Sequence, residues 1–391
     1  MPTVTRQIER ARVSELARNA GLDVTGVTTA ASFGSDLGDI LVDRIRRGHL
    51  DGLPWFTEDR ALFSTTPGNL HPTARSIIAV GIPYWNPDIR HPRDGVLRGR
   101  ISRYAWGRDY HKTLKQRMRH LHELLESETG RTIEARHLVD TARIVDRAAA
   151  ARSGLGWYGK NTMILVPRRG SWVMLGELVV DIDIQPDIPL KPKCGQCTRC
   201  LDVCPTGALV DEYVLHTPSC ISFLTIELRD AIPPEIRPRL GEWVFGCDLC
   251  QEICPYTNAA LPEEDPTFEP RTIDHAYPPL HWLLTMDEAE FRSAFSGTAV
   301  MRAKWAGMAR NASVAIGNIG SEKDLEILER TVSSHPEPLA RGHAAWAMGR
   351  INLTASSEAL SQLRVRETDP SVRSEIDAVL SGDVQAKRTS P

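Results

Sequence analysis

The sequence predicts an α+β multidomain protein with a mixed α/β first region, a small cysteine-rich middle region and a helical last region. Three observations support this fold class. The chain has 391 residues, more than one core fills, since single cores stop growing at about 250–300 residues. All eight cysteines lie between Cys194 and Cys254, and the last third contains a repeated helical pattern. We therefore divide the chain into residues 1–185, 186–262 and 263–391.

The first region mixes the periodicities of helices and strands. Compact apolar runs at residues 76–80 and 173–184 are typical of buried strands. Four apolar residues recur at the spacing of one helical face: Leu114, Met118, Leu121 and Leu125. The polar, proline-rich stretch at residues 185–193 breaks regular structure, so we interpret it as a linker.

The middle region opens with Cys-x2-Cys-x2-Cys-x3-Cys-Pro at residues 194–205, the spacing of bacterial ferredoxins that carry two 4Fe-4S clusters. A second set consists of Cys220 and the half-run at residues 247–255. In such ferredoxins the fourth cysteine of each run binds the other cluster. Crossing the fourth ligands assigns Cys194, Cys197, Cys200 and Cys254 to one cluster and Cys204, Cys220, Cys247 and Cys250 to the other.

Zinc is the competing assignment, because paired Cys-x2-Cys units also form tetrahedral thiolate sites. Three cysteines at two-residue gaps followed by Cys-Pro favour the clusters instead. Four disulfides are a further alternative, which a reducing cytosol disfavours. Two neighbouring clusters form an electron path, and the cysteine module itself does not indicate what is reduced.

The last region follows a loop-rich passage with five prolines between Pro262 and Pro279. Residues 310–319 align with residues 342–351, about 32 positions later, and a weaker copy covers residues 371–380. This period predicts stacked helix pairs of the HEAT-like kind, since one pair cannot bury its own apolar face. The alternative is a short helical cap on the cysteine module.

Charge and hydropathy restrict the class of protein further. No apolar run approaches the about 18 residues of a membrane-spanning helix, and the N-terminus lacks the apolar core of a signal peptide. We therefore expect a cytoplasmic protein without membrane insertion. The formal net charge is −3, yet ten arginines and lysines cluster between Arg90 and Arg119. Such a cluster is either a solvated helix surface or a phosphate-binding surface.

Several motifs together resemble one enzyme family. They extend over most of the chain, at residues 102–111, 139–142, 154–161, 194–208, 220–227, 246–251 and 310–312. In this order and combination they are similar to the motifs of the epoxyqueuosine reductases. A ferredoxin run alone is unspecific, whereas the combination is highly specific.

The resemblance implies a cobalamin-dependent enzyme that removes the epoxide oxygen from epoxyqueuosine at the anticodon wobble position of tRNA, the last step of queuosine biosynthesis. It implies a monomer in which a low-potential donor feeds two clusters, and the clusters feed the corrin cobalt. Two alternatives remain: a corrinoid or flavin reductase of a small molecule, such as a dehalogenase-like protein, and a non-catalytic electron-transfer subunit. The subunit alternative leaves the first 185 residues without a purpose.

Asp140 matches the proton donor of the family. An acid of this kind works near neutral pH when its pKa is raised, and Ile133, Leu138 and Val139 predict an apolar setting that raises it. Taken alone, Asp140 would be read as a surface or helix-capping residue. This chain has Arg143 where the family usually has proline, a difference that either retunes Asp140 or provides a phosphate contact.

The resemblance also implies the cofactor and RNA contacts. Besides Asp140, the expected cobalamin-binding residues are Arg103, Asp109, Lys160, Asn161, Thr162, Ser222 and Asp248. Glycines at residues 154–159 would let the main chain approach a flat macrocycle, or simply form a tight turn. The motif Asp-x-His-x-x-Gly is absent, so we expect base-off cobalamin without a histidine ligand to cobalt. The expected RNA contacts are Arg302, Lys304 and Arg310.

Overall fold

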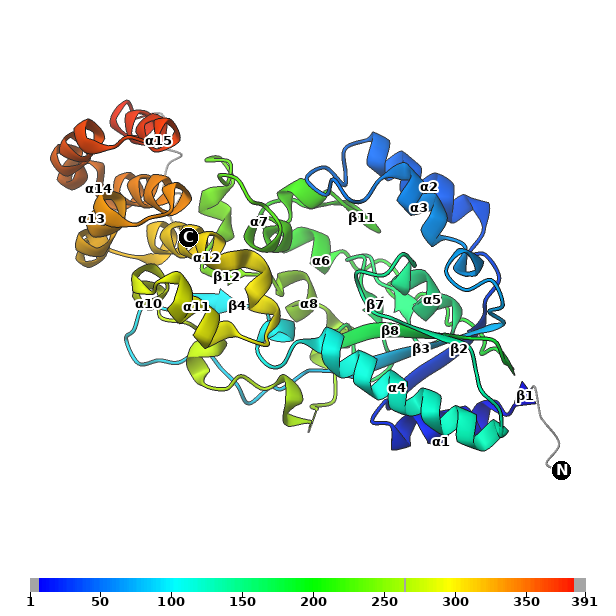
Figure 1. Cartoon of the computed structure of the whole chain (residues 1–391). Coiled ribbons are helices and arrows are strands. Elements are labelled where there is room, and N and C mark those ends of the chain that lie inside the picture. Colours follow the sequence, from blue (N-terminus) through cyan, green and yellow to red (C-terminus); the bar gives the residue numbers. More distant parts are fainter. Residues whose placement is uncertain (1–6, 264, 383–391) are drawn as a thin grey trace.

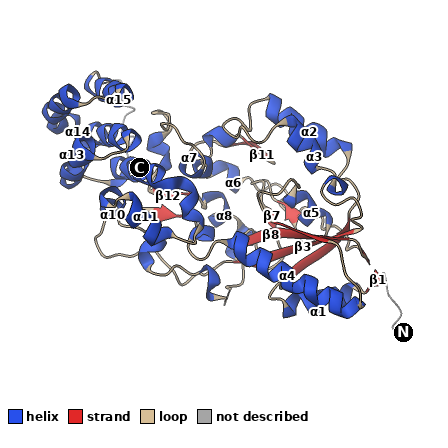
Figure 2. Ribbon diagram, viewed as in Figure 1, coloured by secondary structure: helices blue, strands red, loops and turns tan. Residues whose placement is uncertain are grey.

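The computed structural model describes residues 7–263 and 265–382. Its strands gather mainly at the N-terminal end of the molecule, and the opposite end is built from helices (Figure 2). The predicted mixed α/β region and helical C-terminal region are confirmed in this coarse form. Within the described ranges, no helix is both long and apolar enough to cross a membrane.

A four-stranded antiparallel sheet organises the first region. Its order is β2-β3-β8-β5, with bounds Val24–Thr29, Ser76–Pro83, Val173–Val180 and Ala135–Leu138. Every residue of β3 is buried and pairs with β8, from Ser76 opposite Val180 to Pro83 opposite Val173. The branched apolar run that predicts this strand therefore forms the centre of the sheet.

Helices cover both faces of the sheet (Figure 1). Helices α1 (Arg10–Asn19) and α4 (Tyr110–Thr129) lie on one face, and α5 (Asp146–Arg152) lies on the other. The predicted stripe of α4 is fully buried against the sheet. Helices α2 (Ser35–Arg46) and α3 (Glu58–Ser64) pack together beside this layer.

The middle region is made of short elements. In chain order they are α6 (Arg199–Asp202), β10 (Leu209–Asp211), β11 (Val214–Leu215), α7 (Ile221–Ile226), β12 (Trp243–Phe245), α8 (Leu249–Glu252) and α9 (Pro255–Asn258). Strand β12 pairs in parallel with β4 (Arg100–Ile101) from the first region. Two further small pairs join β1 (Gln7–Ile8) to β9 (Asp183–Ile184) and β6 (Trp157–Tyr158) to β7 (Ile164–Leu165).

The last region is a stack of helices. They are α10 (Leu280–Thr285), α11 (Glu288–Phe295), α12 (Lys304–Ile319), α13 (Leu325–Ser334), α14 (Pro338–Arg366) and α15 (Pro370–Leu380), with the 3-10 turn η7 (Ala299–Ala303) before α12. Helix α14 is kinked at Asn352, whose φ of −157° is not helical.

Equivalent glycines of the sequence repeat let successive helices approach each other. A Cβ at Gly317 of α12 would lie 2.6 Å from a ring atom of Trp346 in α14, and one at Gly349 of α14 would lie 2.3 Å from a methyl of Val379 in α15. The repeated glycine thus permits close packing of successive helices, while the HEAT-like nature of the repeat stays a prediction. One hydrophobic core continues from Ile101 through the cysteine module into these helices, and the region boundaries also stay predictions.

Candidate functional site

The candidate site lies where the end of one strand meets the start of one helix. Strand β5 ends at Leu138, two residues before Asp140, and α4 begins at Tyr110 with Asp109 as its N-cap. The His111 ring bridges two carboxylates: Nε2 lies 3.0 Å from Asp140 Oδ2, and Nδ1 lies 2.8 Å from Asp109 Oδ1. Asp109 Oδ1 also accepts the main-chain N–H of His111 at 3.0 Å, a contact typical of an N-cap.

Hydrogen bonds determine the charges of His111, Asp109 and Asp140. Desolvation disfavours a charged His111, but the bonds to Asp109 and Asp140 outweigh it and raise the pKa of His111 to about 9. Desolvation also disfavours ionisation of Asp140, yet the bond from His111, its charge and a bond from Tyr110 lower the pKa of Asp140. The expectation that an apolar setting raises this pKa is wrong, because the side chain is 49% exposed and faces a cation. At neutral pH an imidazolium lies between two carboxylates.

Aromatic rings and a cation complete the surroundings of Asp140. The ring of Tyr110 stacks on that of His111, with centroids 4.1 Å apart. Desolvation and the carboxylate of Asp140 raise the pKa of Tyr104, whose ring lies 6.0 Å from that of Tyr110. The charge of Arg302, in η7, contributes to the lowered pKa of Asp140. The last region therefore reaches the site.

Sequence reasoning missed Tyr104, Tyr110 and His111 as members of this site. All three lie in the motif at residues 102–111 that supports the family resemblance, which is the one sequence signal for them. The bond from His111 to Asp140 joins residues 29 positions apart, so it depends on how α4 packs on the sheet.

The eight cysteines are free thiols in the middle region, and several of them shift the pKa of one another. Cys200 is under the electrostatic influence of Cys254 and Cys194. Cys250 responds most strongly to Cys220 among the thiols, and Cys247 responds to both Cys250 and Cys220. Cys204 also acts on Cys220. Most of these influences lie within one set of the crossed ligand assignment, but Cys200 also raises the pKa of Cys250 across the two sets, so the assignment stays a prediction.

Lys160 and Asn161 lie at the junction between the first region and the cysteine module. The Lys160 ammonium donates to the main-chain oxygen of Gly195 at 2.7 Å and pairs with Glu212 at 2.5 Å. The Asn161 amide donates to the main-chain oxygen of Cys250 at 3.3 Å. Both side chains thus connect the sheet region to the metal-binding segments, and their cobalamin contacts stay predictions.

The glycines before Lys160 are explained by contacts within the chain. A Cβ at Gly154 would lie 2.6 Å from the main-chain oxygen of Ile188, and one at Gly156 would lie 2.7 Å from that of Leu165. These contacts give no support to the interpretation that the glycines make room for a macrocycle. Thr162 has a positive φ of 66°, which places a strained turn at the same junction.

Asp248 and Arg103 form a buried connection between β4 and α8. The Asp248 carboxylate accepts the main-chain N–H of Arg103 at 2.9 Å and the hydroxyl of Ser102. The Arg103 guanidinium lies over the rings of Trp85 and Trp106, 4.8 Å from each centroid. Its Nε and Nη1 atoms are buried without a hydrogen-bond partner among the described residues. Ser222 lies half-buried at the start of α7.

The three expected RNA contacts lie in different environments. Arg302 and Lys304 are exposed, and Arg302 pairs with Glu227. Arg310 is fully buried and donates to the main-chain oxygens of Leu224, Leu228 and Asp230. The expectation that Arg310 contacts RNA is therefore wrong, because its guanidinium group is buried and its hydrogen bonds are made inside the core.

The fold and the site define an iron–sulfur oxidoreductase. A cysteine module with ferredoxin spacing and a hydrogen-bonded pair of Asp140 and His111 belong to one chain. The model of the family described as "4Fe-4S double cluster binding domain" matches residues 193–257, and that of "Epoxyqueuosine reductase QueG, DUF1730" matches residues 65–141.

Comparison with known proteins identifies the family. The epoxyqueuosine reductase of Bacillus subtilis is 36% identical over 93% of both chains, and that of Escherichia coli is 35% identical over 87% of this chain and 88% of its own. A crystal structure of an epoxyqueuosine reductase with an epoxyqueuosine-modified tRNA-Tyr stem loop has a TM-score of 0.87 at 34% identity, covering 95% of this chain and 98% of that one. A Bacillus subtilis structure with its catalytic aspartate loop swung out of the active site has a TM-score of 0.88 at 33% identity, with the same coverage. The chain belongs to the epoxyqueuosine reductase family.

Proposed function

We propose that this protein reduces epoxyqueuosine to queuosine in the anticodon loop of tRNA. Its similarity to a reductase solved with an epoxyqueuosine-modified stem loop, over nearly the whole of both chains, carries this proposal. The reaction breaks both C–O bonds of the epoxide and leaves an alkene. It consumes two electrons and two protons and releases the oxygen as water.

The cysteine module provides the electron path. Each 4Fe-4S cluster passes one electron at a time, so two clusters suit a two-electron reduction supplied by a low-potential donor. The two sets of four cysteines in the crossed assignment would each bind one cluster. The cluster ligands Cys250 and Cys247 flank Asp248, which connects them to β4 and so to the site.

The residues around the site fit cobalamin, which when bound supplies a low-valent cobalt reductant. Arg103 has two buried donors without a described partner, and these fit the amide and phosphate acceptors of that cofactor. Lys160, Asn161 and Thr162 would lie on its cluster side, with Asp109 on the side of α4. Both ring nitrogens of His111 are engaged with carboxylates, which supports the expectation that this histidine does not bind cobalt; base-off binding rests on the family resemblance.

His111 and Asp140 together deliver protons. Opening the epoxide builds negative charge on its oxygen, and a positioned acid lowers that barrier. The proton of the pair resides on His111 up to a pH of about 9. It passes along the 3.0 Å hydrogen bond to Asp140 and from there to the oxygen, because Asp140 is the more exposed member.

Arg302 and Lys304 bind the RNA backbone beside this site. Positive side chains on an exposed edge supply phosphate contacts that carry affinity and salt dependence. The HEAT-like stack that begins at Lys304 would support the stem. The protein acts as a cytoplasmic monomer.

The test uses holoenzyme prepared without oxygen and tRNA that carries epoxyqueuosine. Nucleoside mass spectrometry should show loss of one oxygen atom, with product formed in the wild type and abolished in Asp140→Asn, while both proteins contain the same iron. Unchanged epoxyqueuosine with fully loaded wild type and a competent reductant would overturn the proposed function.

A further inference from the structure

The loop that carries Asp140 (residues 139–145, the Asp140 loop) connects β5 to α5. Asp140 has a φ of 47°, in the left-handed region that residues other than glycine rarely adopt. Such a conformation persists only when its surroundings determine it. The contacts on each side of the loop therefore decide whether Asp140 reaches His111.

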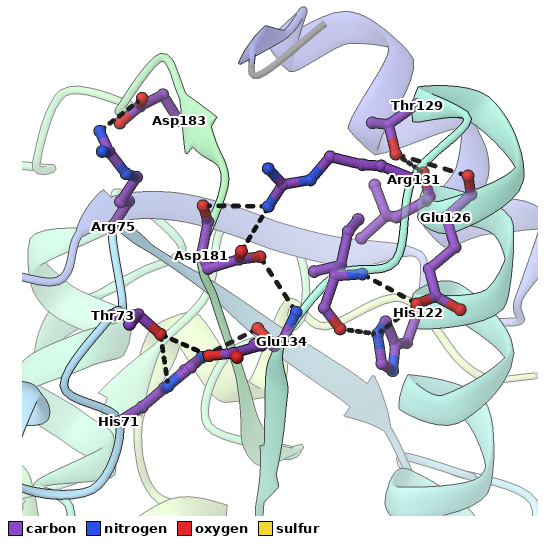
Figure 3. Close-up of polar contacts among 12 residues, drawn as sticks. His71, Thr73, Arg75, His122, Glu126, Thr129, Arg131, Glu134, Asp181 and Asp183 are labelled. Atoms are coloured by element: carbon purple, nitrogen blue, oxygen red, sulfur yellow. Dashed lines mark hydrogen bonds and ion pairs between the residues drawn. The ribbon is translucent and has the colours of Figure 1, made fainter. Parts of the chain in front are cut away.

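The strand before the loop is firmly attached to its neighbours. Figure 3 shows Glu134, which precedes β5, bonded on several sides. Its main-chain oxygen contacts His71 Nε2 at 2.8 Å, its carboxylate accepts the Thr73 hydroxyl at 2.7 Å, and its N–H donates to Asp181 at 3.1 Å. At its other end β5 stays paired with β8 up to Leu138, opposite Glu177, so movement of Asp140 involves the loop and not the strand.

Helix α3 contacts the loop directly after Asp140. The Arg60 guanidinium donates to the main-chain oxygens of Thr141 at 3.0 Å and Ala142 at 3.4 Å. The Arg143 guanidinium lies 3.8 Å from the ring centroid of Phe63. Arg60 and Phe63 are three residues apart, so they share one face of α3. We call these interactions the α3–loop contact.

The two arginines act on the loop in different ways. Arg60 satisfies carbonyl groups of the two residues that follow Asp140, and it also lies 4.9 Å from the ring centroid of Trp55, which keeps it in place. Arg143 attaches its own segment to α3 through a cation–π contact. This position carries arginine where a proline, by the family pattern, could make no such contact.

We propose that Arg60 and Arg143 are positioning residues that keep the Asp140 loop engaged, with the Asp140 carboxylate against His111. The proposal rests on the proton-donor role proposed for Asp140. Neither arginine contacts the reacting atoms; each changes the fraction of molecules in which Asp140 faces the site. Removing them lowers kcat in proportion to the fall in this fraction and leaves KM for tRNA unchanged.

The experiment measures amide hydrogen exchange and turnover on the holoenzyme. In Arg60→Ala, exchange in residues 139–145 should rise about tenfold and kcat should fall about tenfold, since a charged donor to two carbonyls is lost. In Arg143→Ala and Arg143→Pro both changes should be about threefold, because a cation–π contact made by an exposed arginine is weaker. Arg60→Lys should restore part of the protection and part of kcat.

Arg136→Ala is the matched control. Arg136 lies exposed on β5 and donates to the adjacent main-chain oxygen of Ala135, so its loss removes the same charge without touching the loop. Unchanged exchange in both the Arg60 and Arg143 variants would overturn the α3–loop proposal, as would faster exchange with unchanged kcat. Exchange reports on the loop even if the wild type fails to reduce epoxyqueuosine, so failure of the proposed function is recognised separately.

Discussion

His111 offers the sharpest test of the site, because one ring links Asp109 to Asp140. Replacing it in His111→Gln removes the positive charge and keeps a polar side chain of similar length. The change should raise the pKa of Asp140, since desolvation would no longer be opposed by a cation. It should also remove the proton that the pair stores near neutral pH.

The structure gives the expected size of the rise in the pKa of Asp140. The pKa of His111 is about 9 against an ordinary value of 6.5, which corresponds to about 3 kcal/mol at about 1.4 kcal/mol for each pH unit. This is a net value, because desolvation opposes the charge of His111, so the two carboxylates at 2.8 and 3.0 Å contribute at least about 1.5 kcal/mol each. The pKa of Asp140 should therefore rise by about one unit, and by less where water screens the exposed side chain.

The same pKa shifts determine how stability and kcat depend on pH. The folded-state pKa of His111 is raised, so its stabilising interaction is complete below pH 6.5 and is lost as pH rises through about 9. The lowered pKa values of Asp109 and Asp140 contribute stability that is lost as pH falls through them. Wild-type kcat should thus decline above a pH of about 9, and that decline should move to acidic pH in His111→Gln.

Two measurements check this. Titration of histidine side chains by nitrogen NMR, with His111→Gln identifying one resonance among twelve histidines, should give a midpoint near 9. A pH profile of kcat should show the shift in the alkaline decline. A His111 midpoint near 6.5, or identical profiles for the two proteins, would refute the reasoning.

Three further results are expected. Cys220→Ala should reduce the iron content from about eight to about four per chain, measured by iron analysis beside the wild type. Full iron in the variant would contradict the ligand assignment. The double variant Arg302→Ala with Lys304→Ala should weaken tRNA binding and flatten its dependence on salt by a slope of about two, and an unchanged slope would exclude both as phosphate contacts. Burial, followed by the charge of Asp146, raises the pKa of Glu177 well above its ordinary value. The folded protein therefore holds this proton more tightly than the unfolded chain, and the stability that Glu177 contributes is lost as pH rises above about 4.5. Glu177→Gln should therefore unfold at a higher temperature than wild type at pH 9 and differ less at pH 5; equal thermal stability at both values would show that the raised pKa is not real.

The sequence by itself determined the features that depend on neighbouring residues. Cysteine spacing predicts the cluster module because several ligands of one cluster come from a single short loop. The stripe from Leu114 to Leu125 predicts α4, and the repeat at residues 310–319 and 342–351 predicts stacked helices, since each pattern has the period of the element it forms. Motif resemblance indicates the family and Asp140.

Only the tertiary structure decided which side chains meet. Asp140 faces His111 because α4 begins beside the end of β5, and that contact reverses the expected direction of its pKa. Arg310 has the chemistry of an RNA contact, but packing of α12 against the cysteine module buries it. Charge, burial and partnership depend on distances between segments far apart in the chain, and local sequence patterns contain no information on those distances.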